Sequence, residues 1–199
     1  MKNKIWYLLL FVLTLSLGIV SCSSDDDSDS ASGGSSFKID GTSYNLSGSS
    51  QEISVIHLDN AGTDLRSTTV SVIGVNGTTK TGTVSFTLVY KKSLGVSGTY
   101  DIVNITDGDD EDVFDTAESK GRACSGWTST LQMAVISPIS IESANNPSGK
   151  VTVKDNNDGT YTVQFSGKFN KYKDDLTTVE KTFTVDMNVK GKIVENTGG

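Results

Sequence analysis

Apolar and polar residues alternate along most of the chain after Phe37, and this period of two constrains the fold more than any other feature. Residues 84–90 and 183–189 show it most clearly, with Val, Phe, Leu, Met or Tyr at every second position. Because successive side chains of a strand point to opposite faces, the pattern predicts strands with one buried face. No run after Phe37 has apolar residues at helical spacing. The sequence therefore predicts an all-β, antiparallel domain.

Further strands are predicted at residues 37–40, 43–46, 52–58, 68–75, 97–103 and 130–137. Two of these runs, 52–58 and 68–75, carry apolar side chains in both phases, which indicates either a bulge or burial on both faces. Nine or ten short strands are typical of a two-sheet sandwich or a closed barrel. We expect an antiparallel β-sandwich, with a closed lipocalin-like β-barrel as the alternative.

The register of one hairpin can be predicted. Val151 and Val153 must share a face with Val163 and Phe165. A two-residue turn would set polar side chains against these apolar ones, whereas a three-residue loop pairs Val153 with Val163 and Val151 with Phe165. The loop would end at Gly159, in the left-handed conformation of a β-bulge.

Residues 1–21 have the organisation of a secretory signal peptide. Lys2 and Lys4 give a positive start, and residues 5–20 form an uncharged, mostly apolar run. This run is shorter than the roughly 20 residues that a membrane-spanning helix needs. We expect a cleaved signal rather than a retained anchor.

The six residues Leu-Gly-Ile-Val-Ser-Cys that end at Cys22 resemble the lipobox of bacterial lipoproteins. The resemblance implies cleavage before Cys22, followed by acylation of its thiol and of the new amino terminus with chains such as palmitate. Because each buried CH₂ group contributes about 0.8 kcal/mol, several acyl chains would give stable anchoring. Cys22 is therefore the expected lipidation site.

Small and acidic residues follow Cys22. They resemble the Ser/Asp-rich export signal of surface lipoproteins of the Bacteroidota, with the residues Ser23, Ser24, Asp25, Asp26, Asp27 and Asp29. The resemblance implies a protein held by outer-membrane lipid and facing the cell exterior. Residues 23–36 lack large apolar side chains, so we expect residues 22–36 to form a disordered tether of roughly 20 Å root-mean-square reach. A single domain then spans residues 37–199. Its opening, Phe-Lys-Ile-Asp-Gly-Thr, is similar to that of small uncharacterised lipoproteins of the same bacteria, which implies no activity.

Composition excludes several classes of function. The chain has 24 acidic and 17 basic residues, a net charge of −7 and a single histidine. We expect no nucleic-acid partner, because binding phosphates requires clustered Lys and Arg. The two cysteines exclude a disulfide scaffold, and the single histidine excludes His-rich metal sites. The net charge also predicts repulsion from anionic membrane or glycan surfaces at low salt.

Residues 107–118 are the most acidic segment of the chain. As a calcium loop it would offer oxygen ligands at alternate positions from Asp107, Asp109, Glu111, the Val113 carbonyl, Asp115 and Glu118. Such ligands suit Ca²⁺. However, Asp112 stands where an EF-hand requires glycine. We expect a solvated acidic loop, with looser Ca²⁺ binding as the alternative, and no other cofactor.

Three single residues have chemistry of their own. His57 is in phase with Ile53 and Val55, which indicates a packed or edge histidine rather than a metal ligand. Cys124 has no partner if Cys22 is acylated, so we expect a buried, unreactive thiol. Trp127 follows Gly126, and its ring either closes the end of the core or stacks on a ligand such as a sugar.

Two short patterns complete the candidates. Asp-Ser-Ala at Ser30 and Asp-Thr-Ala at Thr116 resemble the O-glycosylation motif of the Bacteroidota. Lysines at 168, 171 and 173 are interleaved with Phe169 and Tyr172, and we expect a solvated loop there because two aspartates follow.

These features predict a surface lipoprotein whose domain is a noncatalytic binding or interaction module for a glycan, a protein or Ca²⁺. Two alternatives remain. One is a structural envelope lipoprotein without a ligand. The other is a glycan hydrolase that uses two carboxylates such as Asp109 and Glu118, which would have to face each other across a cleft.

Overall fold

The computed structural model describes residues 35–46, 52–60, 62–104, 111–136, 138–173 and 177–195. They belong to one compact unit, Gly33–Gly199. The elements in this part of the chain are β1 (Ser36–Ile39), β2 (Thr42–Ser43), β3 (Glu52–Asp59), β4 (Leu65–Asn76), β5 (Lys80–Lys91), the 3₁₀ turn η2 (Lys92–Leu94), β6 (Gly98–Val103), α2 (Glu111–Lys120), β7 (Arg122–Ile136), β8 (Ile139–Asp155), β9 (Thr160–Tyr172) and β10 (Val179–Glu195).

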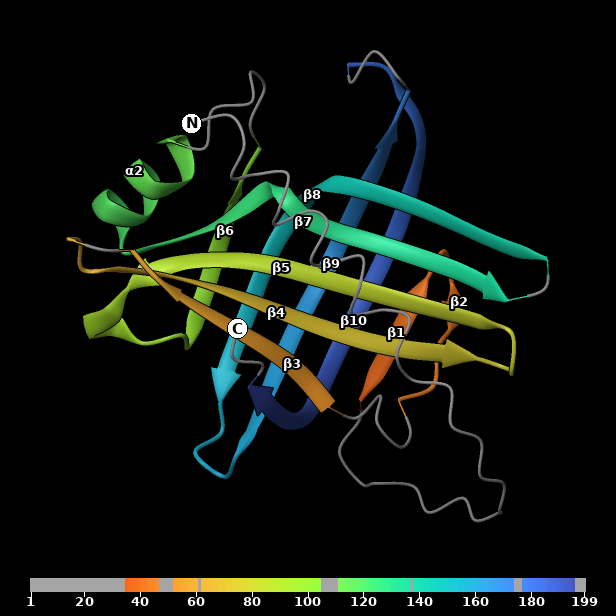
Figure 1. Ribbon diagram of the computed structural model, residues 1–199, viewed down its shortest axis with the longest axis horizontal. Helices are drawn as coiled ribbons and strands as arrows, with labels where there is room; N and C mark the ends of the chain where they lie inside the picture. The colour runs from red at the N-terminus through yellow and green to blue at the C-terminus, as the bar shows by residue number, and fades with distance from the viewer. Residues whose placement is uncertain are drawn as a thin grey trace. The chain divides into compact units, whose positions relative to one another are not determined.

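The ten strands form a single sheet that closes on itself. Its order is β2-β1-β10-β3-β4-β5-β7-β6-β8-β9, and the additional pairings β10–β9 and β7–β8 complete a ring. In Figure 1, β3, β4 and β5 form a front layer, and β8, β9 and β10 pass behind it at a steep angle. The expected all-β fold of about ten strands is confirmed. Two crossed layers joined at their edges combine the features of an orthogonal sandwich and of a barrel.

The expectation of a wholly antiparallel sheet is wrong at two places. β3 runs parallel to β10, and β6 runs parallel to β7. The first follows from the ring itself, which has seven members: β3, β4, β5, β7, β8, β9 and β10. Because directions cannot alternate around an odd-numbered ring, one neighbouring pair must be parallel. β6 is parallel to β7 because both strands pair antiparallel with β8.

The interior of the ring is filled by side chains. Phe86 packs against Phe165 and Phe169, with ring centroids 5.0 and 6.0 Å away. The β1–β2 segment closes one end, where Phe37 lies over Gly74. A Cβ on Gly74 would lie 2.5 Å from the Phe37 ring, so this close packing requires glycine.

The predicted hairpin register is confirmed. Val151 pairs with Phe165 and Val153 with Val163. Gly159 has a φ of +79°, as the bulge requires. Asn157 also has a positive φ, of +56°, which the sequence did not predict.

The two runs with apolar residues in both phases are regular strands. The β3–β4 and β4–β5 ladders contain no register shift, so the bulge alternative is wrong there. Val70 and Val72 are buried inside the ring, whereas Ile73 and Val75 on the outward face are half-buried.

The expectation of a loop at residues 107–118 is wrong for its second half, because residues 111–120 form the helix α2. Val113 and Ala117, four residues apart, are buried in a second apolar cluster with Leu65, Val89 and Ala123. The helix therefore covers the outward side of β4, β5 and β7. Within the described ranges, no helix has the length and apolar character that crossing a membrane requires.

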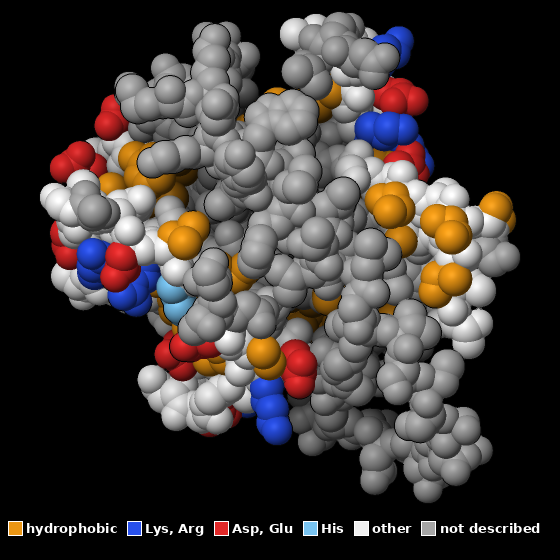
Figure 2. Space-filling view, viewed as in Figure 1, with side chains coloured by type: hydrophobic (Ala, Val, Ile, Leu, Met, Phe, Trp, Pro, Cys, Tyr) orange, Lys and Arg blue, Asp and Glu red, His pale blue; other side chains and the backbone are white. Residues whose placement is uncertain are grey.

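The far end of the β7–β8 hairpin carries exposed apolar side chains. Ile136, Ile139 and Ile141 are 49%, 84% and 58% exposed. Figure 2 shows hydrophobic side chains gathered over this end of the hairpin.

Candidate functional site

The interior of the barrel changes from apolar to polar toward one end. Val55 and Val70, which pair with each other, are fully buried. The next inward pair along the same strands is His57 and Thr68, and the pair after that is Asp59 with Arg66. Because inward positions are two residues apart, two steps along β3 and β4 lead from the core to charged side chains.

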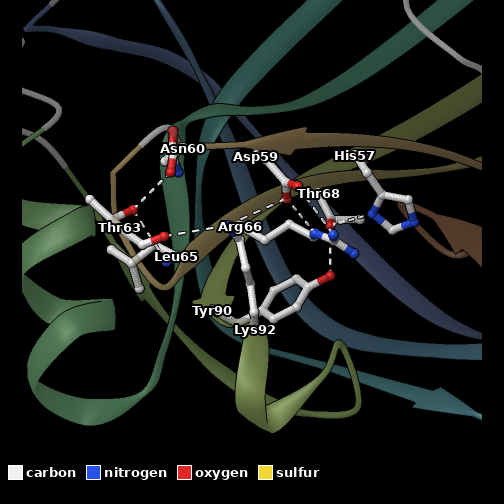
Figure 3. Close-up of polar contacts among 9 residues, drawn as sticks. All are labelled: His57, Asp59, Asn60, Thr63, Leu65, Arg66, Thr68, Tyr90 and Lys92. Carbon is white, nitrogen blue, oxygen red and sulfur yellow. Dashed lines mark hydrogen bonds and ion pairs between the residues drawn. The ribbon is translucent and has the colours of Figure 1, made fainter.

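Four residues cross this end in one row, which we call the mouth row. Asp59, Arg66, Tyr90 and Arg122 are direct neighbours across β3, β4, β5 and β7. All four continue the inward phase of their strands. Figure 3 shows the side chains of Asp59, Arg66 and Tyr90 converging with those of His57 and Thr68.

Asp59 and Arg66 form a two-pronged ion pair. Arg66 Nε donates to Asp59 Oδ1 at 2.7 Å and Nη2 donates to Oδ2 at 3.4 Å. The hydrogen bond from Arg66 lowers the pKa of Asp59 and, reciprocally, raises the pKa of Arg66. Lys92 Nζ lies 4.0 Å from Asp59 Oδ1. This pair is solvent-accessible, so it orients the two side chains more than it stabilises the fold.

A buried hydroxyl links the mouth row to the residues beneath it. Thr68 is fully buried, and its Oγ1 lies 2.8 Å from His57 Nδ1 and 3.0 Å from the Tyr90 hydroxyl. Burial, followed by the charge of Arg66, lowers the pKa of His57. The imidazole is therefore neutral at pH 7. Its hydrogen bond to Thr68 makes it a packed histidine, as expected.

Arg122 has a different environment from Arg66. Its Nη2 donates to the carbonyls of Leu94 and Gly95 at 2.8 and 3.4 Å. Its Nε is buried without a hydrogen-bond partner. Gly98 leaves the space that this guanidinium occupies. Among the residues that the structure describes, Arg122 has no carboxylate within ion-pair distance.

The connection between β3 and β4 flanks the mouth row. Thr63 Oγ1 donates to the Asn60 carbonyl at 3.2 Å, and Lys92 Nζ donates to the Thr63 carbonyl at 3.3 Å. Figure 3 shows these contacts beside the ion pair. An open groove of about 370 Å³ lies next to them, lined by Gly62, Thr63, Asp64, Leu65, Lys91 and Glu118.

The calcium ligands predicted from the sequence do not share one loop. Asp107 and Asp109 lie outside the described residues, whereas Glu111, Val113, Asp115 and Glu118 belong to α2. Val113 is buried against the sheet, and a helical carbonyl accepts a hydrogen bond within its own helix. In the described part of the chain no group of three or more His, Cys, Asp or Glu residues is placed to hold a metal. Calcium binding remains a prediction.

Cys124 and Trp127 lie on β7. Cys124 is fully buried, and burial raises the pKa of its thiol to about 12. The expectation of a buried thiol is confirmed. Trp127 is half-buried and is not among the residues packed on either apolar cluster. Both interpretations of Trp127, closing the end of the core and stacking on a ligand, remain predictions.

The remaining candidates are distributed over the fold. The lysine-rich segment is not a loop, because Lys168 and Lys171 belong to β9 and Phe169 is a fully buried core residue. Thr116 is half-buried on α2. The lipidation, export and first glycosylation residues lie outside the described ranges: Cys22, Ser23, Ser24, Asp25, Asp26, Asp27, Asp29 and Ser30.

Sequence reasoning missed Arg66, Thr68, Tyr90 and Arg122 as a group. A signal for part of it was present, because Arg66 and Thr68 are in phase with the buried Val70 and Val72. A charged residue in the buried phase of a strand indicates either a paired interior charge or the end of the core.

Together, these observations define a small, closed, all-β domain with a charged mouth at one end. Comparison with known proteins found no matching family model, no matching curated protein and no matching solved structure.

Proposed function

We propose that this chain is an outer-membrane surface lipoprotein whose domain is a noncatalytic binding module, and that its mouth holds a small ligand bearing a carboxylate. Anchoring through Cys22 and export through the Ser/Asp-rich segment rest on the sequence patterns described above. The binding site rests on the mouth row. A cation without an ion-pair partner among the described residues is the feature of this row that most needs explanation.

Arg122 is the observation that carries the binding proposal. A partly desolvated cation is stabilised by a nearby opposite charge, and the described residues supply none to Arg122. Arg66, by contrast, already holds Asp59. A carboxylate matches the planar donor set of a guanidinium, so a carboxylate-bearing ligand would supply the missing charge.

The same geometry supports a noncatalytic role. The Thr68 hydroxyl is fully buried and engaged by two partners, so it cannot reach a substrate. His57 uses Nδ1 to hold that hydroxyl. The carboxylate of the mouth row, Asp59, is bound to Arg66. These groups hold one another in place, which suits recognition rather than proton transfer.

Titration by NMR tests the binding site. Adding D-glucuronate to residues 33–199 should shift the backbone amides of Leu94, Gly98 and Arg122, and adding D-glucose should not. Arg122→Gln should abolish the shifts and Arg122→Lys should retain part of them. Lys120→Gln, a matched loss of one nearby exposed charge, should leave them unchanged. Equal shifts with glucose, or unchanged shifts in Arg122→Gln, would contradict the site.

Protease treatment of intact cells tests the location. The full chain should disappear together with a known surface control, while a periplasmic control survives. Cys22→Ala should prevent incorporation of labelled palmitate. Survival of the wild-type protein under these conditions would rule out surface display.

A further inference from the structure

The outward surface of β8, β9 and β10 carries more basic than acidic side chains, although the whole chain is acidic. We call it the basic face: the outward residues of β8, β9 and β10, with those of β1 and β6 beside them. Its charged members are the lysines Lys38, Lys150, Lys154, Lys168, Lys190 and Lys192 and the aspartates Asp101 and Asp186. Two exposed acids border it: Glu52 on β3, the strand neighbour of Lys192, and Asp40, which accepts a hydrogen bond from the Thr184 backbone. Positive charge therefore gathers on one side of a chain whose net charge is −7.

Most of this positive charge is unpaired. Lys150 lies 3.1 Å from Asp101, and Lys190 lies 3.0 Å from Asp158 on the neighbouring turn. The other four lysines of the face form no ion pair within the described ranges, namely Lys38, Lys154, Lys168 and Lys192. All four are exposed. Asp186 accepts a hydrogen bond from Ser166 at 2.5 Å.

A neutral polar row runs across the middle of the face. Thr152, Gln164 and Asn188 are direct neighbours on β8, β9 and β10. Gln164 Nε2 donates to Asn188 Oδ1 at 3.2 Å, and Thr152 shares a hydrogen bond of 3.0 Å with Thr99 on β6. A shallow depression of about 250 Å³ lies over this row, lined by Lys150, Thr152, Gln164, Phe165, Ser166, Met187 and Asn188.

The lysines surround this row on both sides. Lys154 on β8 and Lys190 on β10 both pair with Thr162 on β9, so the three residues form one row across the strands. Because neighbouring strands are about 4.8 Å apart, the backbones of the two lysines are roughly 10 Å apart. Lys150 and Lys38 lie in the row on the other side of the depression, and Lys168 lies one row beyond. Neighbouring rows are about 7 Å apart along the strands.

This arrangement limits the class of ligand. The ladders between β8, β9 and β10 are continuous across this region, so a peptide strand cannot join β9 there. A ligand must therefore contact side chains. Amides and hydroxyls suit sugar hydroxyl groups, and the separated ammonium groups suit repeated carboxylates. The face lacks the exposed apolar core of a stable protein interface.

We propose that the basic face binds an acidic oligosaccharide, with its sugar hydroxyls over the Thr152–Gln164–Asn188 row and its carboxylates at the unpaired lysines. The face is separate from the mouth, because it is formed by outward residues and the mouth row by inward ones. The proposal therefore does not depend on the function proposed for Arg122.

The chain contains one competing occupant. Residues 23–36 carry four aspartates and lead directly into β1, and Ser35 Oγ accepts a hydrogen bond from the Lys190 backbone at 3.1 Å. Their charge would also suit the lysines. The experiment therefore includes this segment as a peptide.

The probe is immobilised polygalacturonate, with dextran as the neutral control. Residues 33–199, the compact unit that contains the whole described core, should bind polygalacturonate and not dextran. Raising NaCl from 50 to 200 mM should weaken binding about tenfold, because salt screens exposed charges.

Two variants of equal charge locate the binding surface. Replacing Lys38, Lys154, Lys168 and Lys192 together by Gln should weaken binding more than tenfold. Replacing Lys80, Lys91, Lys120 and Lys173 by Gln changes the net charge equally and should alter binding less than threefold. Thermal melting checks that both variants fold. Equal losses in the two variants, binding to dextran, or no binding would overturn the proposal.

Further measurements distinguish oligosaccharide binding at the basic face from binding of the chain's own residues 23–36 there and from binding at the mouth. If a peptide of residues 23–36 binds the face more tightly than polygalacturonate fragments, the face holds the tether and the oligosaccharide proposal is wrong. Arg122→Gln should leave polygalacturonate binding unchanged, and the Lys38, Lys154, Lys168 and Lys192 variant should leave the glucuronate shifts unchanged. Failure at one surface is thus separable from failure at the other.

Discussion

The mouth row and the basic face place polar side chains on opposite sides of the same closed sheet. In the mouth, Arg66 holds Asp59, and Thr68 joins His57 to Tyr90. On the basic face, four lysines stand in solvent without an ion-pair partner in the described ranges. Desolvation of an inward polar group is costly, so most groups of the mouth satisfy one another and Arg122, whose Nε has no partner among the described residues, is the exception. Outward polar groups can remain in solvent and available to a ligand. Because successive side chains of a strand point to opposite faces, neighbouring residues of one strand can belong to the enclosed interior and to the solvent-exposed face.

The largest expected effect is on the reactivity of the Cys124 thiol. Cys124 is the next inward residue after Arg122 on β7 and is enclosed beneath the mouth row. Burial raises its pKa to about 12, and only the thiolate reacts. In residues 33–199, alkylation of Cys124 by iodoacetamide at pH 8 should be at least about 100-fold slower in the native state than in urea. Mass spectrometry measures both rates. A native rate within tenfold of the unfolded one would show that this end of the barrel opens readily.

The next largest difference concerns stability. Thr68→Val removes the hydroxyl that both His57 and Tyr90 contact, and should lower the free energy of unfolding by about 1–3 kcal/mol. Thr152→Val is the matched change on the basic face, where the hydrogen bond is exposed, and should cost less than about 0.5 kcal/mol. Urea denaturation measures both values. If Thr68→Val and Thr152→Val lowered the free energy of unfolding by similar amounts, the mouth and the basic face would not differ in how much their hydrogen bonds stabilise the fold.

A smaller effect should follow from pH. The pKa of His57 is lower in the folded protein than its ordinary value of about 6.5. Above that pH the imidazole is neutral in both states. As pH falls through about 6.5 the unfolded chain takes up the proton first, so the free energy of unfolding decreases until the folded pKa is reached.

Urea midpoints between pH 8 and pH 5 measure this contribution when the wild type is compared with His57→Asn. The variant lacks the titrating ring, so the difference between the two curves should shrink toward lower pH. Asp59 and Glu195 act in the opposite direction on His57, and both remain in the variant. A difference that grows toward low pH would mean that the imidazolium is stabilised in the mouth.

The smallest effect is expected for lysines of the basic face. Lys154→Gln should change the free energy of unfolding by less than about 0.5 kcal/mol, because the side chain is exposed and forms no ion pair in the described part of the chain. Urea denaturation at 50 and 200 mM NaCl measures it. A clear loss of stability would indicate that this lysine has a structural role and is not free for a ligand.

Local patterns predicted the local parts of the fold. Alternation located most strands, and the need to keep Val151, Val153, Val163 and Phe165 on one face set the register of their hairpin. The helix α2 was missed because it supplies just two fully buried side chains, Val113 and Ala117, with Phe114 half-buried beside them, and the other buried members of the cluster come from three different strands. Such a short helix is stabilised by packing rather than by its own sequence.

The candidate sites depended on contacts between distant segments. Arg66 and Arg122 are 56 positions apart in the sequence, and they share a row only because β4, β5 and β7 are neighbours. The net charge predicted repulsion from anionic glycans, but the fold gathers lysines from β1, β8, β9 and β10 on one face. A net charge does not record how charges are distributed.

The sequence alone determined the all-β class, the approximate number of strands and, in the clearly alternating strands, the side that each residue occupies, because alternation depends only on the geometry of a single strand. The tertiary structure decided which strands are neighbours, the closure of the ring and the parallel β3–β10 pair. It thereby decided which charges meet. Strand order is set by packing between segments far apart in the chain, and this information is not contained in the pattern of any one strand.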